Sequence, residues 1–110
     1  MLNEADKIIV SDFKGKISVA DLRHISEIIV FGSRARGDIH DSSDLDIAVL
    51  VDEKTEQLEN RLEAIAYDVM YKNDFKIIFS LKLFANDHFQ RALMQGFSFY
   101  VNVKKEGVSV

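Results

Sequence analysis

Two groups of residues in this sequence have types and spacing suited to an anionic, metal-bound substrate. The first is Gly32-Ser33, at the start of the run GSRARG over 32–37. The second is the acid pair Asp44 and Asp46, which follows after a short polar segment. A glycine lets the backbone turn sharply and approach a ligand closely, and a helix that begins there directs N–H groups at an anion. The first group therefore predicts a phosphate-binding turn, to which Ser33 adds a hydroxyl donor.

The acid pair predicts a metal site. Asp44 and Asp46 are two residues apart at the start of a strand-like segment, so their side chains project from the same face. Adjacent carboxylates repel each other unless a cation lies between them. Oxygen ligands of this kind suit Mg²⁺, which keeps several waters and shares the phosphates of its substrate.

Three further polar residues near these groups are candidates for anion binding. Arg34 and Arg36 have the planar guanidinium fork that binds phosphate or carboxylate. Arg36 is the better candidate, whereas a solvated basic loop explains Arg34 equally well. Ser43 is a further phosphate-contact candidate, although turn or capping chemistry explains it most simply.

Three apolar segments are expected to form the sheet that positions these groups. Ile28 to Phe31 is β-branched and aromatic and ends at Gly32, which is typical of a buried strand that runs into a tight turn. Leu45 to Val51 is apolar on both faces beyond Asp46, which predicts a central strand covered by helices. Phe75 to Phe84 is a third β-like run. If the first two strands pair, about 4.8 Å apart, the turn and the acids meet at one edge of the sheet.

Other segments predict helices that cover this sheet. Residues 2–10 have helical spacing of apolar groups and precede a polar break at 12–16. The apolar face of this first segment is Leu2, Ala5, Ile8 and Ile9. A helical turn is expected at 21–24 and a helix at 87–94, whereas the state of the aromatic stretch 97–103 stays open.

The clearest amphipathic helix follows Asp52, which is a good N-cap residue. Its apolar stripe recurs at spacings of three and four: Leu58, Leu62, Ile65, Ala66, Val69 and Met70. Packing at the edge of this stripe is the expected role of Tyr67 and Tyr71, with a partner surface as the alternative. The order of elements favours a single α/β (α+β) domain over residues 1–110.

The composition excludes several classes of protein. The 110 residues are 47% hydrophobic and 29% charged, and no apolar run approaches the roughly 20 residues that cross a bilayer. The N-terminal residues are acidic, unlike a signal peptide, so a cytoplasmic location is expected. Cysteine is absent and the three histidines lack the spacing of zinc ligands. The formal net charge of −4 argues against the binding of long nucleic acid.

The stretch from Gly32-Ser33 to Asp46 resembles the GS-x-x-x-G and D-x-D signature of the polymerase β-like nucleotidyltransferase superfamily. Together with SDLDIAVLVD over 43–52, it looks most like the minimal nucleotidyltransferase (MNT) domains. The resemblance implies a mixed β-sheet flanked by helices. It also implies an enzyme that uses an NTP and one or two Mg²⁺ ions, with attack on the α-phosphate and loss of pyrophosphate.

The resemblance further assigns roles to residues. The triphosphate would be bound by Gly32, Ser33, Arg36 and Ser43. Asp44 and Asp46 would hold the metal, and a two-metal site with ions roughly 3.5 to 4 Å apart needs a third carboxylate from a later strand. Lys76 stands where the family pattern has that acid, and Asp74 is two residues upstream, on the same expected strand face. Either Asp74 acts as the third catalytic acid or that acid is absent.

The family context implies a function and an alternative. MNT proteins are typically antitoxins of HEPN-domain toxins and can transfer AMP to a tyrosine of the toxin. The expected function is therefore Mg²⁺-dependent transfer of NMP, in the form of AMP from ATP, to a HEPN partner. The alternative, favoured by Lys76, is a docking antitoxin that masks its partner with little or no catalysis. Transfer to an antibiotic or an RNA end ranks lowest, because related enzymes use an additional domain, and self-association is left open.

Overall fold

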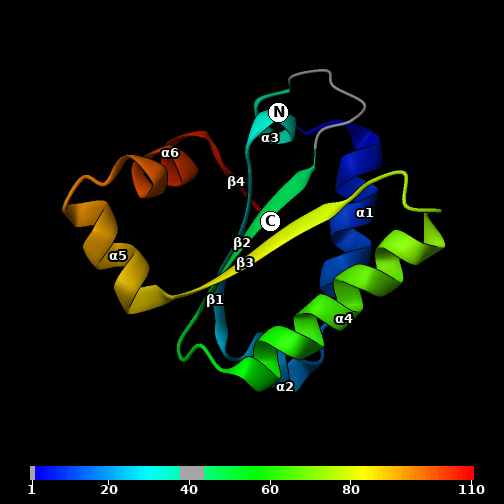
Figure 1. Ribbon diagram of the computed structural model, residues 1–110, viewed down its shortest axis with the longest axis horizontal. Coiled ribbons are helices and arrows are strands. Elements are labelled where there is room, and N and C mark those ends of the chain that lie inside the picture. Colours follow the sequence, from blue (N-terminus) through cyan, green and yellow to red (C-terminus); the bar gives the residue numbers. More distant parts are fainter. Residues whose placement is uncertain (1, 38–43) are drawn as a thin grey trace.

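The computed structural model describes residues 2–37 and 44–110. Its centre is a four-stranded mixed sheet with the strand order β3-β2-β1-β4 (Figure 1). The strands are β1 (Ile25–Phe31), β2 (Leu45–Val51), β3 (Phe79–Ala85) and β4 (Val108–Ser109). β1 runs antiparallel to β2 and to β4, whereas β3 runs parallel to β2. The expected mixed sheet is confirmed, and β4 is an addition that was not predicted.

Helices cover both faces of this sheet. They are α1 (Glu4–Gly15), α2 (Val19–Leu22), α3 (Ser33–Arg36), α4 (Glu56–Lys72), α5 (Asn86–Met94) and α6 (Ser98–Glu106). Figure 1 shows α1 and α4 on one side of the sheet and α5 and α6 on the other. The helices predicted before β1, after β2 and after β3 are confirmed, and the open segment 97–103 is helical from Ser98 onwards. Within the described ranges, no helix is long and apolar enough to cross a membrane.

The larger core lies between the sheet and the helices α1 and α4. Every second residue of β2 is fully buried there: Leu45, Ile47, Val49 and Val51. The helix α4 adds a buried stripe at spacings of three and four: Leu58, Leu62, Ala66 and Val69. Burying one such side chain contributes about 1.5–3 kcal/mol. This apolar pattern decides which faces of β2 and α4 meet.

A smaller core covers the opposite face of the sheet. Ile29 of β1 and Ala48 and Leu50 of β2 pack there against Phe89 of α5 and Val103 of α6. Because side chains alternate along a strand, Asp46 projects from this same face. The smaller core therefore determines which helices lie beside the acid pair.

The first helix differs from its prediction in length and in its buried face. α1 continues through the expected break and ends at Gly15. Phe13, which lies in that segment, is fully buried and packs edge-on against Phe79, with ring centroids 5.6 Å apart. The buried residues of α1 are Asp6, Ile9, Val10 and Phe13. Ile8, expected on the apolar face, is 67% exposed, because the contact with Phe13 rotates the helix away from it.

The start of α4 also differs from its prediction. The N-cap is Thr55, whose Oγ1 accepts a hydrogen bond of 3.1 Å from the N–H of Leu58. Asp52 does not cap this helix, because its carboxylate is bonded to His24. The intervening residues form a bend that carries the chain from β2 to the helix.

The segment before β3 is a turn, and the strand predicted from Phe75 begins only at Phe79. Asp74 and Phe75 both have a φ of 55°, in the left-handed region that often ends helices. The N–H of Phe75 donates to the carbonyl of Met70 over 2.9 Å. This bond closes the end of α4, so these residues are unavailable for the sheet.

Candidate functional site

The structure places the glycine turn beside the acid pair. Phe31, the last residue of β1, lies opposite Asp46 of β2, so the strand end and the strand start meet at one edge of the sheet. Gly32 has φ 79° and ψ −163°, a conformation that side chains disfavour. A Cβ added to Gly32 would overlap Oδ2 of Asp46 and would lie 3.2 Å from its Cγ. Only glycine lets the backbone come this close to the carboxylate.

The two acids are close enough to influence each other. Burial raises the pKa of Asp46, and the negative charge of Asp44 raises it further. The positive charge of Lys82 and a hydrogen bond from Ser80 act in the opposite direction. A site that disfavours its own negative charge gains from a bound cation, and Mg²⁺ is commonly held by one or two carboxylates plus substrate phosphates. Asp44 and Asp46 therefore fit one such ion.

The part of the chain that the structure describes brings no third acid to this pair. Among residues 2–37 and 44–110, no three His, Asp or Glu side chains form a group that could hold a metal ion. Asp74 lies in the exposed turn after α4, so the expectation that it shares a strand face with the acid position is wrong. Lys76 lies in the same turn and does not occupy a strand position either. Both expectations are wrong because they depended on a third strand that starts at Phe75, whereas β3 begins at Phe79.

The sequence pattern did not lead to two polar residues of β3 that lie near Asp46, namely Ser80 and Lys82. Ser80 pairs directly with Asp46, and Lys82 pairs with Ala48, so both project from the face of Asp46. The apolar residues of the strand, on the other face, are Phe79, Leu81 and Leu83. This strict alternation over 79–83 is the signal that would have located the strand and its polar face.

The arginines that flank the turn each have an acidic partner. Arg34 Nη1 lies 2.9 Å from Oδ1 of Asp6, and the two side chains are only 11% and 3% exposed. The interpretation of Arg34 as a solvated loop residue is therefore wrong. Arg36 Nη1 lies 3.3 Å from Oε2 of Glu106 at the surface. Because α3 has a single turn, an anion bound here would depend on individual N–H groups and the Ser33 hydroxyl more than on a helix dipole.

A pocket of about 170 Å³ adjoins Gly32 on the side of α6. Phe31 and Phe99 both line it, with ring centroids 5.8 Å apart. Arg36 and Glu106 also line it. Since Phe31 lies opposite Asp46, the pocket extends the acid site towards α6 and offers room for part of a substrate.

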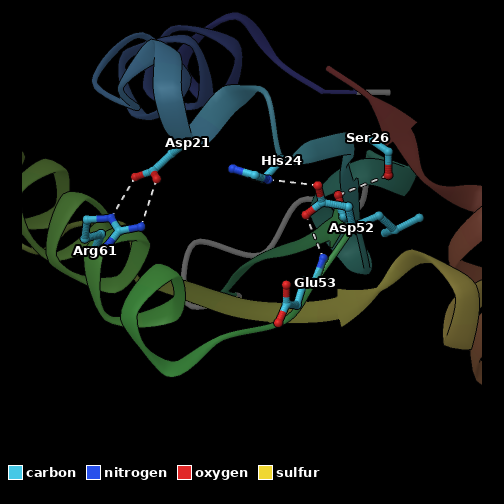
Figure 2. Close-up of polar contacts among 7 residues, drawn as sticks. Asp21, His24, Ser26, Asp52, Glu53 and Arg61 are labelled. Carbon is cyan, nitrogen blue, oxygen red and sulfur yellow. Dashed lines mark hydrogen bonds and ion pairs between the residues drawn. The ribbon is translucent and has the colours of Figure 1, made fainter.

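A second polar cluster lies at the opposite end of β2 (Figure 2). Arg61 donates two hydrogen bonds of 2.9 Å to Asp21, and this bonding lowers the pKa of Asp21. Nδ1 of His24 lies 2.8 Å from Oδ2 of Asp52, and this hydrogen bond lowers the pKa of Asp52. The strand β2 separates these groups from Asp46, which lies at its other end. They hold α2 against α4 and the end of β2, away from the candidate site.

Ser43 falls within 38–43, outside the residues that the structure describes. The phosphate contact expected of Ser43 therefore stays a prediction.

Comparison with known proteins agrees with this geometry. The family model of polymerase beta nucleotidyltransferases matches residues 16–102. A search of curated proteins found no match. The matched range contains the Gly32-Ser33 turn, the acid pair and the strand β3. The chain therefore belongs to the polymerase β nucleotidyltransferase family.

Proposed function

We propose that this nucleotidyltransferase transfers AMP from ATP, with Mg²⁺, to a hydroxyl of a partner protein. The oxygen of the acceptor forms a bond to the α-phosphorus, the bond from the α-phosphorus to the bridging oxygen breaks, and pyrophosphate leaves. The hydroxyl proton passes to solvent. The observation that carries the proposal is the position of the Gly32 backbone against the carboxylate of Asp46, because a turn suited to a phosphate then lies next to an acid suited to a cation.

Different residues of the site would bind the phosphates and the metal ion of the nucleotide. Gly32 and Ser33 would receive the β- and γ-phosphates through backbone N–H groups and the serine hydroxyl. Asp44 and Asp46 would hold the magnesium ion, whose charge offsets that of the phosphates. Arg36, at the rim of the adjoining pocket, would add a guanidinium within the same region.

A tyrosine is the acceptor that this site suits best. No third carboxylate of the described residues stands beside Asp46 to take the proton of the acceptor. A phenol, with a pKa of about 10, gives up its proton more readily than an aliphatic hydroxyl. We therefore propose a tyrosine of a HEPN-domain toxin as the acceptor, in which case the chain acts as the antitoxin.

A docking antitoxin with little or no catalysis is the second candidate. The lack of a third acid among the described residues favours it, and so does an exposed aromatic cluster on α4 and the following turn. Tyr67 and Tyr71 are 58% and 66% exposed, and Phe75 is 42% exposed. The Phe75 ring centroid lies 5.6 Å from that of Tyr67 and 6.2 Å from that of Tyr71. Both tyrosines pack against the Phe75 ring, as expected, and their exposed faces are also suited to a protein contact.

One experiment separates the two candidates. The chain is mixed with a HEPN-domain partner, Mg²⁺ and ATP labelled at the α-phosphate, and the partner is then analysed for label. Transfer predicts label on the partner that disappears with Asp46→Asn, while the complex still forms. A complex without label, in the natural chain as in Asp46→Asn, would support docking alone. Tyr67→Ser/Tyr71→Ser tests the contact surface and should weaken the complex without altering Mg²⁺-dependent ATP binding.

A further inference from the structure

The strand β3 presents an ammonium group where a two-metal site needs another carboxylate. Ser80 is the β3 residue beside Asp46, and Lys82 follows it on the same face, beside Ala48. The polar groups that β3 offers to the acid pair are thus a hydroxyl and a positive charge. Neither is a ligand of choice for Mg²⁺, which takes carboxylate, carbonyl and water oxygens.

One ring contact and one charge interaction place Lys82 near the site. Its Nζ lies 5.5 Å from the ring centroid of Phe99, at a distance where the ring face attracts a cation. Phe99 packs edge-on against Phe31, the residue opposite Asp46. The charge of Lys82 also acts on the carboxylate of Asp46. Lys82 is therefore placed towards the acid pair, and its side chain is still exposed enough to contact a ligand.

The charges of the site argue against two divalent ions. Two such ions in a shared site lie roughly 3.5 to 4 Å apart and need several carboxylates to hold them. The described residues supply Asp44 and Asp46, and Lys82 adds a positive charge that a second divalent ion would have to approach. A lysine ammonium, by contrast, is itself an established ligand of nucleotide phosphates.

We propose that this site binds its nucleotide with one divalent cation, on Asp44 and Asp46, and that the ammonium of Lys82 takes the place of the second ion and contacts the nucleotide phosphates. This inference rests on the proposed nucleotide-binding function. It makes Lys82 a binding residue of the site and distinguishes this site from one that holds two ions.

Counting bound ions tests the first half of the proposal. The natural chain is first saturated with an ATP analogue whose bond between the α- and β-phosphates cannot be cleaved. Mn²⁺ is then titrated in, and the concentration of free Mn²⁺ is measured by electron paramagnetic resonance. We expect one protein-dependent ion for the natural chain and two for Lys82→Asp, which restores an acid on the face of Asp46. Two ions in the natural chain would overturn the proposal.

Metal-free binding tests the second half. In EDTA, calorimetry should show residual ATP binding that Lys82→Met weakens by about tenfold or more and Lys82→Arg largely retains. Lys76→Met is the matched control, because it removes an equal charge from the exposed turn before β3 and should leave affinity unchanged. Equal affinity of Lys82→Met and the natural chain would overturn the role of Lys82. Absence of all nucleotide binding, with Mn²⁺ as well, would instead overturn the proposed function.

Discussion

Arg34 and Asp6 form a nearly buried ion pair that joins α3 to α1, with 2.9 Å between the guanidinium nitrogen and the carboxylate oxygen. Arg34 directly follows Ser33, so the pair fixes the Gly32-Ser33 turn against the N-terminal helix. The position of the turn therefore depends on a residue far from the motif in sequence.

Breaking this pair should destabilise the fold. Asp6→Asn is expected to lower the free energy of unfolding by about 3 kcal/mol, because it removes the charge of a buried carboxylate that is bonded to Arg34. Urea unfolding at pH 7 measures the change. Asp12→Asn is the control, since the ion pair of Asp12 with Lys16, at 3.6 Å, lies at the surface and should contribute less than about 1 kcal/mol. Similar losses in both variants would contradict the role given to Asp6.

Gly32→Ala should remove nucleotide binding. The added Cβ meets the carboxylate of Asp46 and also requires a positive φ, which costs a non-glycine residue about 1–2 kcal/mol. Gly96→Ala shares a positive φ of 76° but meets no atom within 4 Å. Both variants should therefore lose stability, whereas Mg²⁺-dependent ATP binding should be lost in Gly32→Ala alone. Calorimetry that found the same affinity in the two variants would refute the close approach of Gly32 to Asp46.

Asp46→Asn should bind no metal yet fold as well as the natural chain. Burial and the charge of Asp44 raise the pKa of Asp46, so ionisation of this carboxyl group costs more free energy in the folded chain than in the unfolded chain. In EDTA the Tm of Asp46→Asn should equal or exceed that of the natural chain. Asp52→Asn should instead lower the Tm, because its hydrogen bond with His24 favours the ionised form. A fall in Tm for Asp46→Asn as large as that for Asp52→Asn would show that the acid is structural.

The pair of Asp21 and Arg61 should make stability depend on pH in acid. Its hydrogen bonds lower the pKa of Asp21. The contribution of the pair is therefore complete above about pH 3.9, the pKa of an unfolded aspartate, and is lost as the pH falls through the lower folded value. Arg61→Gln should be less stable than the natural chain at pH 7 and should converge with it in strong acid.

Urea unfolding over a pH series measures this difference. Arg23→Gln, which removes the same charge from an exposed position at the end of α2, is the control. A difference between the natural chain and Arg61→Gln that stayed constant with pH would mean that Arg61 acts through packing and not through Asp21.

Much of the sheet and the first part of the site followed from local patterns. β2 was predicted with its observed bounds, because a run that is apolar on both faces has few alternatives to a central strand. The meeting of Gly32 with Asp46 followed from the pairing of two such strands. The third strand was misplaced, because the apolar residues before it resemble a strand while the left-handed turn at Asp74 and Phe75 leaves little trace in sequence.

The sequence by itself determined the family, the acid pair and the glycine that must lie beside it, because these depend on residue type and on the short spacing along adjoining strands. Only the tertiary structure decided which residues from distant parts of the sequence lie next to the turn and the acid pair. Asp6 reaches Arg34 because Phe13 packs into the core and sets the rotation of α1. Lys82 reaches the acids because β3 pairs with β2 in a register set by burial on both faces of the sheet, and no local pattern encodes that register.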